Sequence, residues 1–351
     1  MKALDGNDAE LRNLIRALVR YHFSEWHYNS HFGGDPLEAL LMRENPITSF
    51  QPHWHSDRYD EVVQGFFDTG YEDYDKGISL FAGYQDYVQQ PLLEALKTST
   101  DPALDALQRK LLTTNYFLLE DEVRSLLKPH MKKLERHIRK GESLYRARIG
   151  YELKARPNED WGKSVHYKPY SAAALGAPPP HLAGSGRLNR PGVSYLYLAT
   201  DEMTALSEVR PHPGHHVSVG AFKCLKKVRV ADFNAISIRD YCRSDKALDQ
   251  YLLLKTIDEL FSLPVPPEER GRYSFTQFLS DALRHLGFEG VGFKSSVGTG
   301  ANFTVFDPRA FKYVADSAKV LRVEQLEYRV ATTETVKSDG DYLTGPDGKL
   351  I

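Results

Sequence analysis

Apolar residues recur at helical spacing through the first 140 residues of the chain. Such runs lie in residues 11–19, 62–67, 104–111 and 126–138. The first run follows Asn7 and Asp8, either of which can cap a helix. Pro129 interrupts the last run, where it either kinks the helix or begins a new segment. The pattern predicts an all-α N-terminal domain over residues 1–140.

From Gly141 onward the pattern changes to short alternating runs, which are typical of strands. Strands are predicted over residues 143–149, 195–199, 217–219, 228–230, 290–294 and 303–306. Helices are predicted over residues 201–209, capped by Asp201, and over residues 245–262 and 274–287. Residues 151–192 are rich in Pro, Gly, Ala and Ser and predict a long loop. The fold class is therefore α+β, with an α+β domain over residues 141–351 behind the helical one.

The composition is that of a soluble globular protein, with 41% hydrophobic and 26% charged residues among 351. No run approaches the roughly 20 apolar residues of a membrane-spanning helix, and the first residues lack the apolar core of a signal peptide. The only cysteines are Cys224 and Cys242, which excludes a disulfide scaffold and a Cys-rich zinc site. We expect a cytoplasmic protein without a membrane partner.

The formal net charge of the chain is -2. A protein held on nucleic acid mainly by phosphate contacts usually has a basic excess. We therefore expect no nucleic-acid partner, although the balance leaves room for a local basic patch.

Two arginines and one glutamate in the second half are candidates for chemistry. Arg146 lies on a predicted strand and is either a surface salt-bridge partner or a residue that binds a phosphate through two parallel hydrogen bonds. Arg187 is a second candidate of this kind. Glu208 lies among small and apolar residues on a predicted short helix. A helical glutamate is commonly solvated, but a partly buried carboxylate needs a partner or a function.

Residues 293–302 combine glycines with small hydroxyl residues, among them Ser295 and Ser296. Such a stretch after a strand either lets backbone amides approach a ligand or forms a plain turn. It is not a Walker P-loop, because it has no Gly-Lys-Ser/Thr and no helix follows it directly.

Two groups of histidines resemble metal-ligand spacing loosely. They are His53, His55 and Asp57, and His212, His215 and His216. No Cys or Glu ligand at a fixed offset completes either group. We expect surface histidines and no metal site.

Five segments in a fixed order resemble the RES domain, a family named for its arginine, glutamate and serine. They read Leu-Tyr-Arg-Ala (144–147), Gly-Arg-Leu-Asn (186–189), Tyr-Leu-Tyr-Leu-Ala (195–199), Thr-Ala-Leu-Ser-Glu-Val (204–209) and Phe-Lys-Ser-Ser (293–296), with Asn302 after them. The resemblance covers about residues 141–315. It implies an ADP-ribosyltransferase-like split β-sheet, and the helical region ahead of it resembles a HEPN-type extension. Residues 151–185 and 239–272 look like expansions of a shorter domain.

The resemblance also implies an activity. RES domains degrade NAD⁺ by cleaving the nicotinamide–ribose bond, with water or phosphate as acceptor, and many are toxins of bacterial toxin–antitoxin pairs. By this resemblance NAD⁺ is the substrate, phosphate a co-substrate, no cofactor or metal is needed, and an antitoxin is a partner. We also expect a homo-oligomer. The matching catalytic residues are Arg146, Glu208 and Ser295, and the matching substrate-binding residues are Tyr197, Arg187, Ser296 and Asn302, with Ser296 as the alternative match for the family serine.

Other functions compete with NAD⁺ degradation. One is transfer of ADP-ribose to a macromolecule, and another is a non-catalytic NAD⁺-sensing interaction protein. A third is an RNase in the helical half, because HEPN nucleases place an Arg shortly before a His. Arg16 and His22, like Arg124 and His130, have that spacing, but such pairs arise easily by chance. For the helical domain we favour a structural or sensing role.

Overall fold

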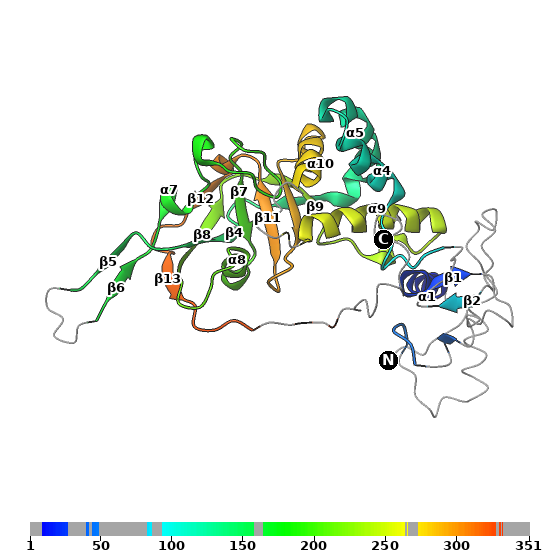
Figure 1. The fold of residues 1–351 in the computed structure, drawn as a ribbon, viewed down its shortest axis with the longest axis horizontal. Coiled ribbons are helices and arrows are strands. Elements are labelled where there is room, and N and C mark those ends of the chain that lie inside the picture. Colours follow the sequence, from blue (N-terminus) through cyan, green and yellow to red (C-terminus); the bar gives the residue numbers. More distant parts are fainter. Residues whose placement is uncertain are drawn as a thin grey trace, which may run out of the picture.

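The computed structural model describes residues 9–26, 40–41, 44–48, 83–85, 93–157, 164–263, 265, 273–327, 330 and 332. The run predicted at residues 62–67 and the group His53, His55 and Asp57 lie outside these residues. The fold is mixed α/β, with a helical N-terminal region and one large sheet (Figure 1).

The N-terminal region is mostly helical, as predicted. Its helices are α1 (Ala9–His22), α4 (Pro102–Leu111), α5 (Glu120–Leu127) and α6 (Met131–Leu134), with short 3-10 turns η2 (Tyr116–Leu119) and η3 (Lys128–His130). Asp101 caps α4 by accepting hydrogen bonds from the backbone N–H groups of Ala103 and Leu104, and Pro102 occupies the first turn.

The prediction that the first 140 residues are all helical is wrong at three short strands. They are β1 (Ser24–Trp26), β2 (Gly83–Gln85) and β3 (Glu135–Ile138). The helix predicted through residue 138 is interrupted at η3, which contains Pro129. Beyond it, β3 pairs antiparallel with β9 (Val228–Asp232) and buries Ile138, so tertiary pairing overrides the helical spacing.

The large sheet has nine strands in the order β12-β8-β4-β7-β11-β10-β9-β3, with β13 also pairing with β8. Its further strands are β4 (Ser143–Ile149), β7 (Leu196–Ala199), β8 (His216–Cys224), β10 (Gly290–Lys294), β11 (Ala301–Val305), β12 (Phe311–Tyr313) and β13 (Lys319–Arg322). Among the described strand pairs, β9 with β10 is the only parallel one. Every predicted strand is present, but β8 is longer than expected and β12 and β13 were not predicted.

Helices cover the sheet at two places. The short helix α8 (Glu202–Glu208) packs against β4, β7 and β8. The longer helices α9 (Asp245–Ser262) and α10 (Tyr273–His285) share one apolar core with β9, β10, α4 and α5. The predicted helices of the second half are thus confirmed, and α5 lies beside α10 (Figure 1). The division near Lys140 stays a prediction; β3, which precedes it, lies in the large sheet.

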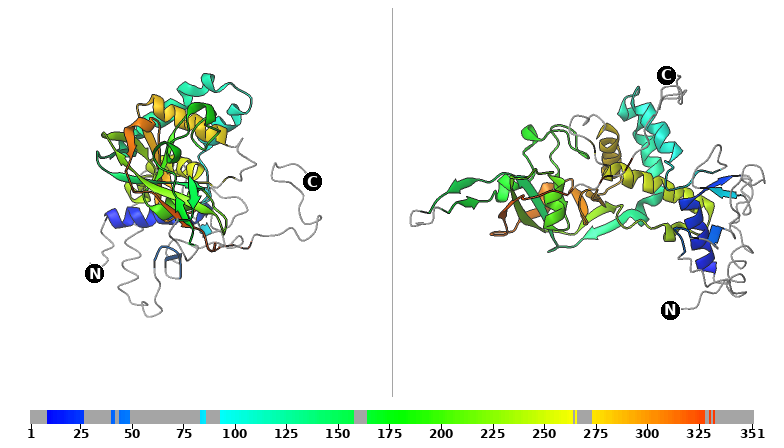
Figure 2. Two further views of the ribbon diagram at one scale, coloured as in Figure 1. Left: turned by 90° about the vertical axis from the view of Figure 1, so that its left-hand side faces the viewer. Right: turned by 60° about the horizontal axis from the view of Figure 1, so that its bottom comes forward.

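The long loop predicted over residues 151–192 contains structure of its own. A two-stranded hairpin, β5 (Leu153–Ala155) with β6 (His166–Lys168), projects from the body of the protein (Figure 2). After it come α7 (Ala172–Leu175) and η4 (Pro180–Leu182). Two more 3-10 turns, η5 (Ile238–Tyr241) and η7 (Pro308–Ala310), lie in the described part of the second half.

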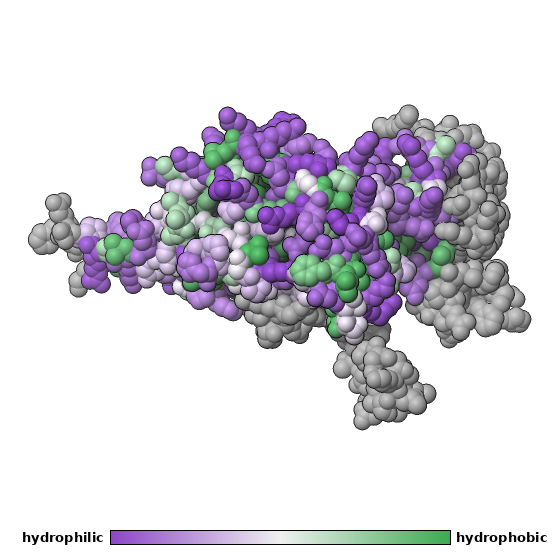
Figure 3. Space-filling model, turned by 90° about the horizontal axis from the view of Figure 1, so that it is seen from above, coloured by the Kyte–Doolittle hydropathy of each residue, from purple (hydrophilic) through white to green (hydrophobic). Residues whose placement is uncertain are grey.

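On the face drawn in Figure 3, hydrophilic residues separate small hydrophobic patches of the described residues. Among the described residues, no helix is both long and apolar enough to span a membrane.

Candidate functional site

A cavity of about 510 Å³ opens between α8, the central strands and the loop before β7. This volume lies in the range of about 300–1,000 Å³ that is usual for small-molecule sites. Five of the seven residues predicted from the sequence line it: Arg146, Arg187, Tyr197, Glu208 and Asn302. They come from segments up to 156 residues apart in the chain, so the fold brings the predicted set together.

The Glu208 carboxylate, at the end of α8, is held by two hydrogen bonds on one oxygen. Ser295 donates from Oγ to Glu208 Oε1 at 2.7 Å, and Asn302 donates from Nδ2 to the same oxygen at 2.6 Å. Among the described residues no hydrogen bond reaches Oε2. The carboxylate is therefore fixed in position by one oxygen, while the other oxygen is left for a ligand.

The loop after β10 can place Ser295 there because two glycines let it approach α8 closely. A Cβ at Gly298 would lie 2.9 Å from the Cα of Thr204, and one at Gly300 would lie 2.2 Å from Asp201 Oδ2. Thr204 Oγ1 accepts the N–H of Gly300 at 3.0 Å. The loop is thus tied to the first turn of the helix that carries Glu208.

Asp201 caps that helix. It accepts the backbone N–H of Thr204 at 2.8 Å and the Thr204 hydroxyl at 2.7 Å. Burial alone would raise the pKa of Asp201, but the hydrogen bonds from Thr204 and Thr200 outweigh it and lower the pKa below its ordinary value. The cap therefore stays ionised and complements the helix N-terminus.

Ser295 and Ser296 differ sharply in position. Ser295 Oγ accepts the backbone N–H of Gly298 at 2.9 Å while it donates to Glu208, so its hydroxyl is fully engaged. Ser296 is exposed and does not line the cavity. The amides of Gly298 and Gly300, expected to approach a ligand, are bonded within the protein.

Arg146 is a partly buried cation without a counter-ion. Its Nη1 donates to the carbonyl oxygen of Tyr197 at 3.1 Å, and its buried Nε has no hydrogen-bond partner. No carboxylate pairs with it among the residues that the structure describes. Burial lowers the pKa of Arg146 to about 10, with a smaller contribution in the same direction from Arg148. An anion in the cavity would relieve this cost.

Two further arginines reach the cavity. Arg187 Nη1 donates to the carbonyl oxygen of Phe261, and its guanidinium lies 5.7 Å from the ring centre of Phe293. Arg210 Nη1 donates to the carbonyl oxygen of Val265 at 3.3 Å. Three arginines line the cavity, namely Arg146, Arg187 and Arg210, and Glu208 is the one carboxylate among its described lining residues. The cavity therefore has an excess of positive charge, which suits phosphates.

The hydroxyl of Tyr197 makes its hydrogen bonds within the protein. It donates to Asn189 Oδ1 at 2.7 Å and accepts the backbone N–H of Leu188 at 3.1 Å. Gly186 lies so close that a Cβ there would come within 2.2 Å of Asn189 Oδ1. Tyr197 therefore fastens the segment that carries Arg187, and burial raises the pKa of its hydroxyl.

Sequence reasoning missed several lining residues. Arg210 lines the cavity two positions after Glu208 and has a positive φ of 47°. No pattern in the sequence predicts this backbone conformation. Tyr273, Val265 and Phe293 reach the cavity from segments that are distant in the chain.

The remaining candidate groups lie apart from this cavity. His215 Nδ1 accepts the backbone N–H of His212 at 3.1 Å, and His216 stacks on Tyr167. The part of the chain that is described holds no group of three or more residues able to bind a metal ion.

The two Arg–His pairs differ in placement. Arg16 and His22 both lie on α1, and Arg16 is buried. Arg124 lies on α5 and His130 on η3, so a helix break separates them.

Comparison with known proteins gives a match to a protein family and a similar solved structure. Among solved structures, the M. tuberculosis MbcT-MbcA toxin-antitoxin complex contains a chain with 13% identity and a TM-score of 0.31, over 57% of this chain and 92% of that one. No curated protein matches the sequence. The sequence model of the RES domain matches residues 158–330, which is 173 of the 351 residues. The matched stretch holds Arg187, Tyr197, Glu208, Ser295 and Asn302 and begins after Arg146, and it supports assignment of this part of the chain to the RES domain family.

Proposed function

We propose that this chain degrades NAD⁺ by cleaving its nicotinamide–ribose bond, as the RES resemblance predicts. One observation carries the proposal: a carboxylate with one free oxygen shares a cavity with a partly buried arginine that lacks a counter-ion among the described residues. NAD⁺ offers the matching groups, a ribose next to a cationic leaving group and a pyrophosphate.

The bond that breaks joins ribose C1′ to the nicotinamide nitrogen. Its electron pair goes to the ring, which leaves as a neutral molecule, so departure needs no general acid. Positive charge develops on C1′, and the free Oε2 of Glu208 would stabilise it in the transition state. Ser295 and Asn302 act through Glu208, because both bind its other oxygen and hold it in place.

The acceptor then bonds to C1′. Water would give ADP-ribose, and its proton would pass to Glu208 and on to solvent. Phosphate would give ADP-ribose phosphorylated at that carbon, with no proton to remove from a dianion. Arg146 would hold either the pyrophosphate of NAD⁺ or the incoming phosphate, and Arg187 and Arg210 supply further donors for these anions.

The RES resemblance also implies a biological role for this activity. A protein that removes NAD⁺ would act as a bacterial toxin or defence effector, held in check by an antitoxin protein. The ADP-ribosyltransferase-like fold is part of the same proposal.

Separating the products of purified protein with NAD⁺, with and without phosphate, tests the reaction. We expect nicotinamide release, together with ADP-ribose or its phosphorylated form. In the matched variant Glu208→Gln, which keeps the shape but loses the charge, turnover should fall by about 10²-fold or more. Absence of nicotinamide release under both conditions would refute the proposal, and label from NAD⁺ on a macromolecule would indicate ADP-ribosyl transfer instead.

A further inference from the structure

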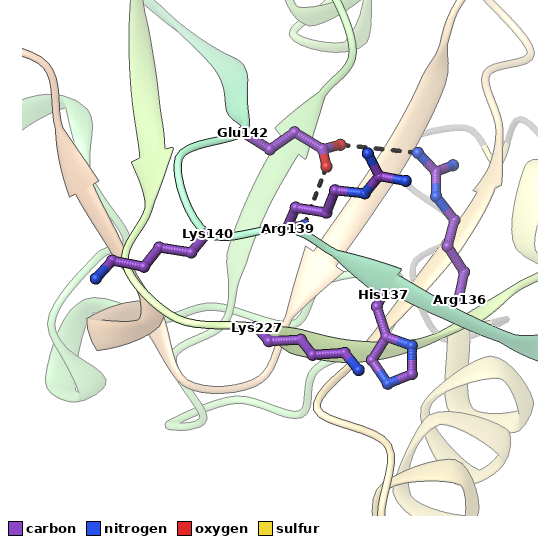
Figure 4. Close-up of a pocket in the computed structure, with 6 residues that line it drawn as sticks. All are labelled: Arg136, His137, Arg139, Lys140, Glu142 and Lys227. Carbon is purple, nitrogen blue, oxygen red and sulfur yellow. Dashed lines mark hydrogen bonds and ion pairs between the residues drawn. The ribbon is translucent and has the colours of Figure 1, made fainter.

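A second hollow, of about 670 Å³, lies at the edge of the large sheet and shares no lining residue with the cavity described above. We call it the basic groove. Its walls are β3, the turn from β3 to β4, and the turn from β8 to β9 (Figure 4). It is lined by Arg136, His137, Arg139, Lys140, Glu142 and Lys227.

The basic groove lies beside a segment with a strong positive charge, although the chain as a whole is nearly neutral. Residues 128–140 hold six Lys or Arg and one acid, Glu135, which gives a formal charge of 6 − 1 = +5 with His neutral. The whole chain carries -2. Positive charge is therefore concentrated in this segment, three of whose cations, Arg136, Arg139 and Lys140, line the groove.

Part of this charge is already paired. Arg136 Nη1 lies 3.0 Å from Asp232 Oδ2, and its Nη2 lies 3.7 Å from Glu142 Oε1. Glu142 also accepts the backbone N–H of Arg139 at 3.1 Å, which fixes the turn that carries Arg139 and Lys140. These contacts organise the floor of the groove.

Three cations remain available. Within the described ranges, no carboxylate pairs with the guanidinium of Arg139 or with the ammonium groups of Lys140 and Lys227. Arg139 and Lys140 are exposed on the turn after β3, and Lys227 is exposed on the turn before β9. Figure 4 shows that they come from two different turns, with the side chain of Lys140 pointing away from those of Arg139 and Lys227. Their ordinary partners are carboxylates or phosphates.

The edge itself favours an extended protein segment. β3 ends the sheet and pairs only with β9, so its outer side faces no described strand. An extended peptide can add to such an edge through its backbone while its side chains meet flanking groups. Single-stranded nucleic acid, by contrast, is usually held by aromatic rings on which bases stack, and the groove is lined by none.

We propose that the basic groove docks an acidic, extended segment of a protein partner, whose carboxylates pair with Arg139, Lys140 and Lys227. This inference goes beyond the proposed function. It requires neither NAD⁺ nor the cavity that would bind it.

Fluorescence anisotropy of a labelled oligoglutamate peptide with the full-length protein at low salt tests the proposal. The triple variant R139E/K140E/K227E should weaken peptide binding about tenfold, because each exposed ion pair contributes a few-fold to binding and the new charges repel the peptide. The control K154E/R156E/K312E reverses three exposed cations outside the groove, so the net charge changes equally. It should change binding by no more than about twofold.

The outcomes separate the alternatives. Equal loss of peptide affinity in both variants would mean attraction by overall charge and would overturn the proposal. Tighter binding of an oligouridine RNA of the same length, lost only in the groove variant, would also overturn it in favour of a nucleic-acid surface. Circular dichroism and nicotinamide release should be unchanged in both variants, which keeps this test separate from that of the proposed function.

Discussion

Replacing Tyr197 by Phe removes one hydroxyl and leaves the aromatic ring in the cavity wall. That hydroxyl is the described partner of both Asn189 Oδ1 and the backbone N–H of Leu188. The exposed fraction is 6% for Asn189 and 0% for Leu188, so water cannot easily take its place. Each buried polar group left without a partner costs about 1–3 kcal/mol, and two such groups therefore predict a loss of at least about 2 kcal/mol.

Urea unfolding measures this loss as a lower midpoint at an unchanged m-value. Tyr145→Phe is the matched control, because Tyr145 lines the same cavity and its hydroxyl makes no hydrogen bond among the described residues. We expect the control to stay within about 0.5 kcal/mol of the wild type. In Tyr197→Phe, nicotinamide release per folded molecule should fall modestly, since the ring remains but Arg187 is held less firmly. A free energy of unfolding equal to that of the wild type would refute the assigned role of the hydroxyl.

Three other changes test the site. Arg146→Met removes a partly buried cation whose buried Nε has no hydrogen-bond partner. It should therefore raise the free energy of unfolding at neutral pH by about 1–3 kcal/mol and abolish stabilisation by added phosphate, and a less stable variant in urea would contradict this. Gly300→Ala places a Cβ 2.2 Å from Asp201 Oδ2, whereas a Cβ at the control position Gly184 meets nothing within 4 Å. Gly300→Ala should therefore lower the free energy of unfolding by about 1–3 kcal/mol and reduce turnover by displacing Ser295, and Gly184→Ala should do neither. Burial raises the pKa of Asp258 to about 6 from its ordinary 3.8, with Glu259 and Asp232 acting in the same direction against Lys294. The folded state thus binds the proton more tightly, and stability contributed by Asp258 is lost as the pH rises through this window. Asp258→Asn should therefore be more stable than the wild type near pH 7 and equal to it near pH 4 in urea titrations.

Local patterns predicted the elements that are stabilised locally. The strand at residues 143–149 and the helix at residues 245–262 have the predicted bounds, because alternation and a Ser244 cap are present in the sequence itself. Strands β3, β12 and β13 were missed because they are short, and their pairing with β9 and β8 joins positions distant in the chain.

The same distinction applies to the site. The order of motifs selected Arg146 and Glu208, and the structure brings them into one cavity. The sequence could not show that Ser295 and Asn302 meet on a single oxygen of Glu208. Nor could it show that Tyr197 bonds to Asn189, because side-chain hydrogen bonds depend on the packing of separate elements.

The long strand β8 has one consequence for shortened forms of the protein. β4 pairs with one side of it over residues 217–223. The other side is shared by two short strands, with β12 on residues 222–224 and β13 on residues 216–219. A chain cut between Tyr313 and Lys319 would keep β12 but strip β13, and half of the β8 edge would lose its backbone partners. Such an unpaired edge is a template for pairing with other chains. Proteolysis at this one connection would therefore replace the short edge strand β13 by an unpaired stretch of the longer strand β8, which would be a site of aggregation.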